Sequence, residues 1–289
     1  MKIWMDGQLV DESQAKVSVF DHGVLYGDGV FEGIRIYNGK VFQCKAHIDR
    51  LFESAEKLRL PIPYSKAELV DAMYACIEAN SLTDSGYIRL VVTRGAGTLG
   101  LHPFKCPNAG VFIIADQIQL YPAELYETGM AVIIAKRLRI RPDMLDPSVK
   151  GLNYLNNILA KMEAIDVGLL EAVMLNHEGY ISECTGDNIF IIVDGKLMTP
   201  PPSAGILLGV TRNVAMMLAK AVGIEVIERN ITPEELKAAD EIFLTGTAAE
   251  IMAVTKVDET VIGDGKAGPV TSQLLQAFRD FINAAAASD

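Results

Sequence analysis

The chain has 289 residues, half of them hydrophobic, which is enough to bury a sizeable core in each of two domains. Its formal net charge of -11 comes from 37 acidic and 26 basic side chains that are interspersed along the chain. This balance disfavours a nucleic-acid partner, which needs a concentrated basic surface. The longest uncharged stretch is short and contains three prolines, and Asp6 near the start is not typical of a secretory signal. We therefore expect a cytoplasmic protein without a membrane partner.

The four cysteines are Cys44, Cys76, Cys106 and Cys184, and no two of them form a C-x-x-C pair. Such spacing is not typical of a zinc site or of a disulfide framework. We expect no bound metal.

The first half of the chain alternates strand and helix patterns. Runs rich in valine and isoleucine predict strands at residues 30–37, 87–93 and 111–115. Between the first two, apolar residues spaced by three and four predict a helix over 46–58, and Ser65 with Glu68 forms the capping box of a second helix. Residues 116–128 contain Pro122 and few branched side chains, so we place the connection between two domains there.

The second half mixes the same patterns. Strands are predicted at residues 131–135, 172–175, 189–193, 225–227 and 241–244. Asp194 and Gly195 predict a tight hairpin, and Thr232 with Glu235 predicts another capped helix. Because helices and strands do not alternate regularly, the sequence predicts an α+β fold rather than a doubly wound sheet. We divide it into a small domain over residues 1–117, a connection over 118–128 and a larger domain over 129–289.

A glycine pattern after the second predicted strand is similar to a dinucleotide-binding fingerprint. Gly95, Gly97 and Gly100 spell G-x-G-x-x-G. That fingerprint requires a helix whose first amides bind a pyrophosphate, and Pro103 and Pro107 disfavour a regular helix here. The sequence favours a glycine-rich loop. An NAD-dependent oxidoreductase and a binding protein without catalytic activity remain the weaker alternatives.

Four polar segments have the residue types of a site for an anionic ring cofactor. Lys150 precedes an amphipathic helix, where shielding from water favours the neutral amine that forms imines, although a lone lysine is most often a solvated surface residue. Glu183 lies in a polar turn between two strands and is either a hairpin end or an anion beside a protonated ring nitrogen. Residues 209–212 and 245–249 are rich in small residues and hydroxyls, as in a simple cap and turn or in a phosphate site.

Together and in this order, these segments resemble the branched-chain amino acid aminotransferases, which are fold-type IV enzymes dependent on pyridoxal 5′-phosphate. The resemblance runs from about residue 26 to residue 254, with residues 26–35 similar to the family's first signature and His47 with Arg50 similar to its H-x-x-R element. It implies a two-domain α+β fold like that of D-amino acid aminotransferase. The smaller domain is then α/β, and the larger one contains a β pseudo-barrel.

The resemblance also implies a role for each cofactor residue. Lys150 is the catalytic residue, which holds the cofactor as a Schiff base and moves the proton between substrate and cofactor. Glu183 pairs with the pyridine nitrogen, and Tyr154 donates to the phenolic oxygen. The phosphate is bound by Arg50, Val210, Thr211 and Thr247.

The same resemblance addresses the substrate. Tyr87 and Arg89 match the Tyr-x-Arg of the branched-chain enzymes, whereas the chain lacks the Arg-x-His of the D-amino acid enzymes. This favours transamination between L-leucine, L-isoleucine or L-valine and 2-oxoglutarate over D-amino acid or (R)-amine transamination and over aminodeoxychorismate lyase activity. The other residues expected at the substrate are Tyr26, Phe31, Gly33, Ala248 and Tyr121, the last as a lid.

Two further expectations concern assembly and sequence departures. In relatives the glycine-rich loop reaches the pocket of the neighbouring subunit, so the resemblance implies a homodimer at least. Cys184 and Thr185 follow Glu183 where many relatives carry glycine or alanine. The cofactor assignment does not depend on these two positions.

Overall fold

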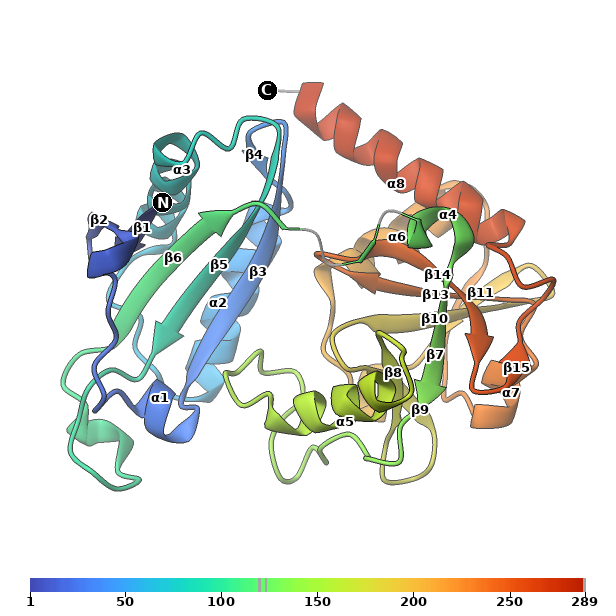
Figure 1. Ribbon diagram of the computed structural model, residues 1–289, viewed down its shortest axis with the longest axis horizontal. Coiled ribbons are helices and arrows are strands. Elements are labelled where there is room, and N and C mark those ends of the chain that lie inside the picture. Colours follow the sequence, from blue (N-terminus) through green and yellow to red (C-terminus); the bar gives the residue numbers. More distant parts are fainter. Residues whose placement is uncertain (119–120, 123, 288–289) are drawn as a thin grey trace. The chain divides into compact units, whose positions relative to one another are not determined.

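The computed structural model describes residues 1–118, 121–122 and 124–287, the last three of these by their backbone alone (Figure 1). Contacts divide the chain into two compact units, unit 1 with Met1–Ile118 and Val149–Asn153 and unit 2 with Gln119–Ser148 and Tyr154–Asp289. This differs from the contiguous division expected from the sequence, because residues 149–153 pack with the N-terminal unit. Both units contain helices and strands, so the α+β prediction is confirmed.

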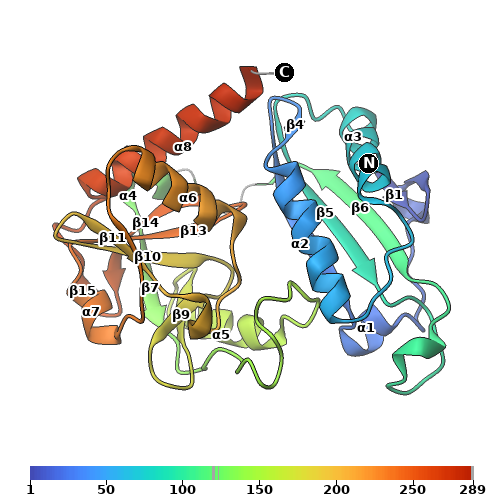
Figure 2. The same ribbon diagram turned by 180° about the vertical axis from the view of Figure 1, so that it is seen from behind.

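In the described chain, unit 1 is built on a six-stranded antiparallel sheet with the strand order β2-β1-β6-β5-β3-β4. The strands are β1 (Lys2–Met5), β2 (Gln8–Asp11), β3 (Gly29–Tyr37), β4 (Lys40–Val41), β5 (Ser85–Thr93) and β6 (Gly110–Asp116). Helices α2 (Cys44–Lys57) and α3 (Lys66–Ala79) cover one face of this sheet (Figure 2), and the short helix α1 (His22–Tyr26) precedes β3. Two 3₁₀ turns, Glu12–Gln14 and Pro103–Lys105, complete the unit.

The core of unit 1 lies between the sheet and its two helices. Its largest fully buried side chains are Ile34, Ile36, Leu51, Leu69, Met73, Ile88, Leu90 and Ile113. The predicted helix over 46–58 is α2, whose buried stripe contacts β3. The predicted capping box before α3 is present, because Ser65 Oγ accepts from the Glu68 amide at 3.3 Å and Glu68 Oε2 accepts from the Ser65 amide at 2.7 Å.

The described part of unit 2 contains a nine-stranded sheet with the order β12-β11-β10-β13-β14-β7-β8-β9, and β15 pairs with β14. The strands are β7 (Met130–Ile134), β8 (Ala172–Leu175), β9 (Ile181–Cys184), β10 (Asn188–Val193), β11 (Lys196–Thr199), β12 (Val226–Glu228), β13 (Glu241–Gly246), β14 (Glu250–Val257) and β15 (Thr260–Val261). The last strand of the order, β9, lies against β10 near the other end. The sheet therefore curls back on itself, as expected of a pseudo-barrel.

Helices pack on the outside of this curled sheet. They are α4 (Leu125–Thr128), α5 (Leu155–Asp166), α6 (Val210–Ala221), α7 (Pro233–Lys237) and α8 (Pro269–Ala287), with a 3₁₀ turn at Pro202–Ala204. Helix α6 packs on β13, helix α8 packs on β13 and β14, and helix α5 packs on β8. Asp194 and Gly195 have positive φ angles of 51° and 72°, which confirms the predicted hairpin between β10 and β11. The capping box of Thr232 and Glu235 is also present.

The glycine pattern at residues 95–100 forms a loop, as predicted. No α-helix begins at these glycines, and the first helical turn after them is the 3₁₀ turn Pro103–Lys105. The loop is held to α1, since the hydroxyl of Tyr26 accepts from the Gly100 amide at 2.9 Å and the ring of His22 bonds the carbonyl of Thr98 at 2.9 Å. This geometry gives no support to a dinucleotide site.

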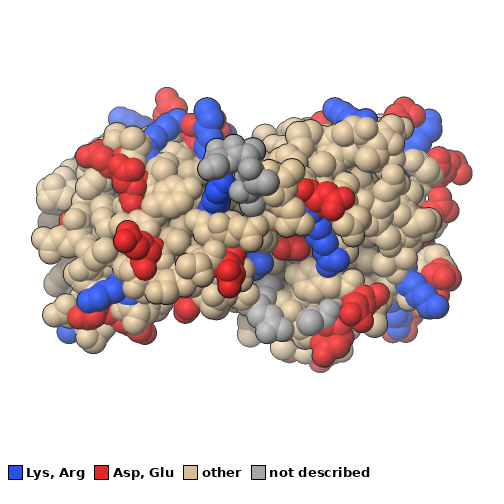
Figure 3. All heavy atoms as spheres, turned by 90° about the horizontal axis from the view of Figure 1, so that it is seen from above, with Lys and Arg blue, Asp and Glu red and all other residues tan. Residues whose placement is uncertain are grey.

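Acidic and basic side chains are mixed on the surface, as they are along the sequence. Figure 3 shows acidic and basic side chains interspersed on the face that it draws, without a continuous basic patch. Across residues 1–118, 121–122 and 124–287, no helix combines the length and apolar character that a membrane span requires.

Candidate active site

Lys150 lies in a short segment that is fastened to the edge of β3. The Phe31 amide donates to the Lys150 carbonyl at 3.0 Å, the Leu152 amide donates to the Gly29 carbonyl at 2.9 Å, and the Lys150 amide donates to Ser54 Oγ at 3.2 Å. The Lys150 Nζ lies 4.6 Å from the centroid of the Phe31 ring, within cation–π distance. The backbone is thus fixed, and the amine packs against an aromatic surface.

The same ring borders a second cationic group. Arg89 lies opposite Gly33 in the β3–β5 pairing, and its guanidinium is 4.5 Å from the centroid of Phe31. Arg89 Nη2 donates to the Tyr87 hydroxyl at 3.1 Å. A Cβ on Gly33 would lie 1.9 Å from that hydroxyl, so glycine is what lets Tyr87 lie across β3. The structure therefore brings Phe31, Gly33, Tyr87, Arg89 and Lys150 together.

A buried carboxylate joins β3 to helix α2. Glu32 is fully buried and accepts from Arg50 Nε and Nη2, both at 2.8 Å, and bonds His47 Nδ1 at 2.7 Å. Burial acts to raise the pKa of Glu32, but the charge and hydrogen bonds of Arg50 and the hydrogen bond of His47 outweigh it and lower the pKa to about 2. Burial lowers the pKa of His47, against the opposing effect of Glu32. Arg50 is thus oriented by Glu32, and its contact with a phosphate stays a prediction.

In unit 2, Glu183 of β9 is a buried carboxylate held at both oxygens. Its Oε1 lies 2.6 Å from Arg139 Nη2, and its Oε2 accepts from Asn188 Nδ2 and from the Leu207 amide, both at 3.0 Å. Charge-assisted bonds of this kind favour the ionised carboxylate. This arrangement suits the predicted pairing with a protonated ring nitrogen.

Two segments of unit 2 fit a phosphate group. Helix α6 begins after Gly209, no side chain of the described residues caps its first turn, and a Cβ on Gly209 would lie 2.1 Å from Asn188 Oδ1. Half-buried small residues form the turn between β13 and β14, beside Thr245, whose buried Oγ1 has no hydrogen-bond partner within the described residues. Amides of a helix N-terminus and hydroxyls at a small-residue turn are typical donors to phosphate, so these residues fit the expected cofactor.

Tyr154 and Tyr121 of unit 2 lie in different surroundings. Tyr154 immediately precedes α5 as its N-cap residue. Tyr121 is buried in the core of unit 2, and its hydroxyl donates to Asp187 Oδ2 at 3.0 Å. Burial and the neighbouring Asp187 raise the pKa of Tyr121. This placement gives no support to the expected lid, because the hydroxyl is engaged in the interior.

Sequence reasoning missed a buried acid cluster next to Glu183. Glu171 accepts from the amide and hydroxyl of Thr185 and from Lys161 Nζ, the last at 3.1 Å. Its Oε2 also lies 3.4 Å from the Tyr121 hydroxyl, which connects it to Asp187. Burial raises the pKa of Asp187, and the charge of Glu171 raises it further. In the sequence, these residues are ordinary acids at strand ends, and no spacing signals that they meet.

Replacing Asp187 by asparagine is expected to change how stability depends on pH. Because the pKa of Asp187 is raised in the folded protein, the folded state binds more protons than the unfolded state, so wild-type stability falls as pH rises above about 4. The variant lacks this decline. Thermal unfolding followed by circular dichroism should show Asp187→Asn gaining more than about 1 kcal/mol on wild type between pH 5 and pH 8.

The exposed Asp166 at the end of α5 offers a matched control, and Asp166→Asn should follow wild type at both pH values. A difference between Asp187→Asn and wild type that does not vary with pH would contradict the assignment.

The predicted site residues fall into two groups. Tyr26, Phe31, Gly33, Arg50, Tyr87, Arg89 and Lys150 lie in unit 1, and Tyr121, Tyr154, Glu183, Val210, Thr211, Thr247 and Ala248 lie in unit 2. That both serve one cofactor stays a prediction.

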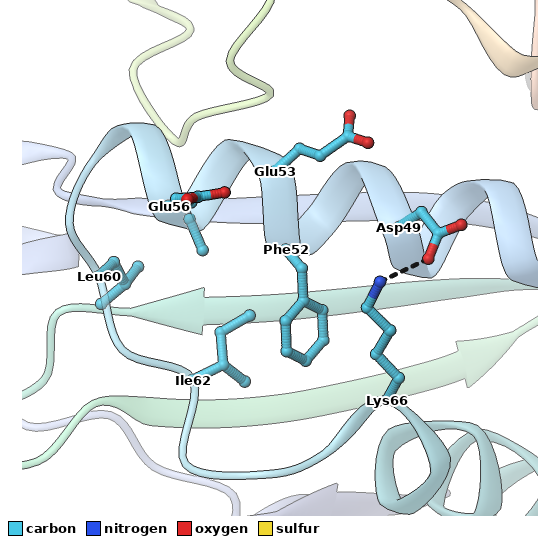
Figure 4. Close-up of a pocket in the computed structure, with 8 residues that line it drawn as sticks. Asp49, Phe52, Glu53, Glu56, Leu60, Ile62 and Lys66 are labelled. Atoms are coloured by element: carbon cyan, nitrogen blue, oxygen red, sulfur yellow. Dashed lines mark hydrogen bonds and ion pairs between the residues drawn. The ribbon is translucent and has the colours of Figure 1, made fainter.

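A hollow of about 400 Å³ lies beside α2 in unit 1 (Figure 4). Phe52, Leu60 and Ile62 lie on its apolar side, and Lys66 pairs with Asp49 across it while its Nζ lies 5.3 Å from the centroid of the Phe52 ring. The residues that line this hollow include none of those predicted for the site. It is therefore not the candidate active site.

Comparison with known proteins yields consistent matches. A family model described as "Amino-transferase class IV" matches residues 29–257. A protein of Methanocaldococcus jannaschii named putative branched-chain-amino-acid aminotransferase is 50% identical over 97% of this chain and 96% of that protein. The branched-chain-amino-acid aminotransferase of Escherichia coli is 40% identical over 96% of this chain and 91% of that protein.

Solved structures give the same result. The crystal structure of the E. coli enzyme superposes with a TM-score of 0.94 at 39% identity, covering 97% of this chain and 94% of that chain. The branched-chain amino acid aminotransferase of Thermobaculum terrenum, solved in its PLP-form, has a TM-score of 0.88 at 29% identity, covering 98% and 94%.

Proposed function

Since the chain belongs to the class IV aminotransferase family, we propose that it is a pyridoxal-phosphate-dependent transaminase that moves the amino group between L-leucine, L-isoleucine or L-valine and 2-oxoglutarate. The fold-type IV architecture expected from the sequence is confirmed by the structural matches. One observation carries the proposal. The Phe31 ring borders both the Lys150 amine and the Arg89 guanidinium, which combines a reacting amine, an apolar surface and a carboxylate-binding cation in one cluster.

Pyridoxal phosphate, when bound, supplies an aldehyde for covalent attachment and an electron-withdrawing ring. In this proposal, the amine of Lys150 holds that aldehyde and moves the proton at the substrate's α-carbon. Glu183 accepts a hydrogen bond from the protonated ring nitrogen, and Tyr154 donates to the phenolic oxygen. Phosphate is bound by Arg50, Val210, Thr211 and Thr247. Support comes from the ionic contacts of Glu183 in unit 2 and from the PLP-form of the Thermobaculum terrenum relative.

The proposed substrate pocket takes two kinds of side chain in turn. Phe31 contacts the branched apolar chain, and Arg89 with Tyr26 binds the distal carboxylate of 2-oxoglutarate. Tyr87 and Ala248 contact the α-carboxylate. An apolar surface discriminates by only about 1–3 kcal/mol per methylene, so we expect all three branched-chain amino acids to react.

A panel of L- and D-amino acids with 2-oxoglutarate tests the activity, and borohydride reduction tests the cofactor. We expect turnover of the three L-branched-chain substrates and a cofactor mass on the peptide that contains Lys150. Turnover of D-amino acids alone would overturn the substrate assignment. Binding of a nicotinamide cofactor without the Lys150 adduct would overturn the proposal as a whole.

Replacing Arg89 by glutamine is expected to weaken binding of 2-oxoglutarate much more than binding of L-leucine. Loss of a charged donor weakens binding of a carboxylate by about 10- to 100-fold, so the KM for 2-oxoglutarate should rise by that factor while the KM for L-leucine changes little. Steady-state kinetics with each substrate varied in turn measures both values. Arg59→Gln, at an exposed arginine of unit 1, serves as the matched control. Equal increases in both KM values would refute this role.

The proposal includes a cytoplasmic homodimer or larger homo-oligomer. Leu99 and Leu101 in the glycine-rich loop are 72% and 80% exposed, which is unusual for large apolar side chains that lie close together. Covering by a second copy accounts for them. Sedimentation should show a dimer or larger assembly, and a fully active monomer would contradict it.

A further inference from the structure

We propose that Arg139 is a positioning residue that holds the Glu183 carboxylate ionised and correctly oriented for the cofactor's ring nitrogen. The inference rests on the proposed function and adds to it a residue that does not itself touch the cofactor. Arg139 follows β7, and no motif in the sequence marks it.

The contact between the two residues is short and buried. Arg139 Nη2 lies 2.6 Å from Glu183 Oε1, and the two side chains are 9% and 7% exposed. A guanidinium removed from water loses several kcal/mol of solvation, and this loss is offset only by close pairing with an anion. The pair is therefore better explained by a requirement for charge at this place than by a gain in stability.

Other elements hold the arginine itself. Arg139 Nη1 donates to Asn157 Oδ1 on α5 at 2.8 Å, and Asn157 Nδ2 donates to the Thr185 carbonyl at 2.8 Å. The Arg139 amide donates to the Leu175 carbonyl at 2.8 Å, which joins its segment to the end of β8. The guanidinium is thus fixed from two directions, and it fixes one oxygen of Glu183 while Asn188 and the Leu207 amide fix the other.

The surroundings explain why a cation is needed. The carboxyls of Glu183, Glu171 and Asp187 and the buried thiol of Cys184 lie close enough to act on one another electrostatically, and the Lys161 ammonium also acts on this group. Lys161 pairs with Glu171, whereas Arg139 pairs with Glu183. Three acids placed close together in a buried region favour uptake of a proton. A protonated Glu183 could not stabilise a protonated ring nitrogen.

The test compares Arg139→Gln and Arg139→Lys with wild type. Pyridoxal phosphate is titrated into apoenzyme and followed by visible absorbance between pH 6 and pH 9. We expect Arg139→Gln to lose at least about tenfold in cofactor affinity, with the larger loss at the acid end of the range. Without the neighbouring cation, the Glu183 carboxyl takes up a proton at a higher pH than it does in wild type. Arg139→Lys should recover part of the affinity, since lysine keeps the charge but lacks the two Nη atoms that bond Glu183 and Asn157 separately. Arg141→Gln, at an exposed arginine two residues away, should match wild type.

A double-mutant cycle with Glu183→Gln separates positioning from general structural damage. If Arg139 acts through Glu183, adding Arg139→Gln to Glu183→Gln should cost little further affinity. Additive losses, or a loss that is the same at every pH, would overturn the inference.

A second variant and the wild-type measurement complete the test. If Arg139→Gln does not fold, Asn157→Ala removes the side-chain amide that orients the guanidinium, together with its bond to the Thr185 carbonyl, and should give a smaller loss with the same pH dependence. Unchanged affinity in that variant would overturn the inference. Wild type that does not bind pyridoxal phosphate would overturn the proposed function as well, whereas wild-type behaviour of Arg139→Gln would overturn this inference alone.

Discussion

Replacing Lys150 by alanine is expected to lower the transamination rate by at least about 10²–10⁴-fold, which is the usual contribution of a positioned acid–base group. The loss should exceed this range because the same amine also holds the cofactor's aldehyde. The backbone bonds that fasten residues 149–152 to β3 and α2 do not involve the side chain, so the fold should be unaffected.

The measurement is the rate of 2-oxoglutarate consumption with L-leucine, together with the cofactor dissociation constant. Affinity should fall less than the rate, because the proposed phosphate contacts of unit 2 remain. Lys45→Ala, at a lysine on α2 that is 91% exposed, is the control and should keep wild-type activity. A Lys150→Ala variant that still turns over near the wild-type rate would remove Lys150 from the mechanism.

The parts of the fold that could be predicted are those with a local cause. The capping boxes at Ser65 and Thr232 and the hairpin at Asp194 depend on side chains and φ angles within a few residues, and all three are present. Strand β8 has the predicted bounds, while β3, β5 and β6 are each extended by one or two residues at one or both ends. Strands β1, β2, β4, β9, β14 and β15 were missed, and Glu183, which was expected in a turn, lies in β9. Strands β1 and β2 are only four residues long and half exposed, so they lack a periodic apolar signal.

The division into two units could not be predicted fully, because it depends on contacts between distant parts of the chain. Residues 149–153 belong to unit 1 because the Val30–Gly151 bridge and its neighbouring hydrogen bonds join them to β3, across more than a hundred residues of sequence. No local pattern encodes such a return of the chain. Composition shifts can mark where one region ends, but not which later segment packs against it.

The candidate site divides in a similar way. Residues with a distinctive motif, such as Lys150 and Glu183, could be named from the sequence, while the side chains that orient them could not. Arg139 is 44 residues before Glu183, and Glu32 meets His47 and Arg50 only because β3 and α2 pack together. These supporting contacts depend on tertiary packing, which no local pattern in the sequence encodes.

Replacing Glu32 by glutamine is expected to destabilise unit 1 by about 3–5 kcal/mol, the usual cost of leaving one partner of a buried ion pair unmatched. Arg50 and His47 would then lie beside a neutral amide in a largely buried site. Trp4 is the only tryptophan of the chain and is buried in unit 1, so its fluorescence during urea unfolding reports on this unit. Glu53→Gln, on the exposed side of α2, should leave the unfolding midpoint unchanged.

The pH dependence of unfolding identifies the cause. The pKa of Glu32 is about 2 in the folded protein and near 4.5 without the fold, so its stabilising contribution is complete above about pH 4.5 and is lost as pH falls toward 2. Wild type should therefore lose stability over that range more steeply than Glu32→Gln. Parallel pH profiles for the two proteins would show that the ionised carboxylate is not the source of the difference.

A second substitution distinguishes an unmatched charge from a lost packing contact. Adding Arg50→Met to Glu32→Gln removes the cation that was left without its anion, and removing both partners of a buried pair costs less than removing one. The double variant should therefore be more stable than Glu32→Gln alone, while its affinity for pyridoxal phosphate should be lower if Arg50 binds the phosphate. Stability and cofactor affinity would then change in opposite directions, which simple loss of packing does not produce.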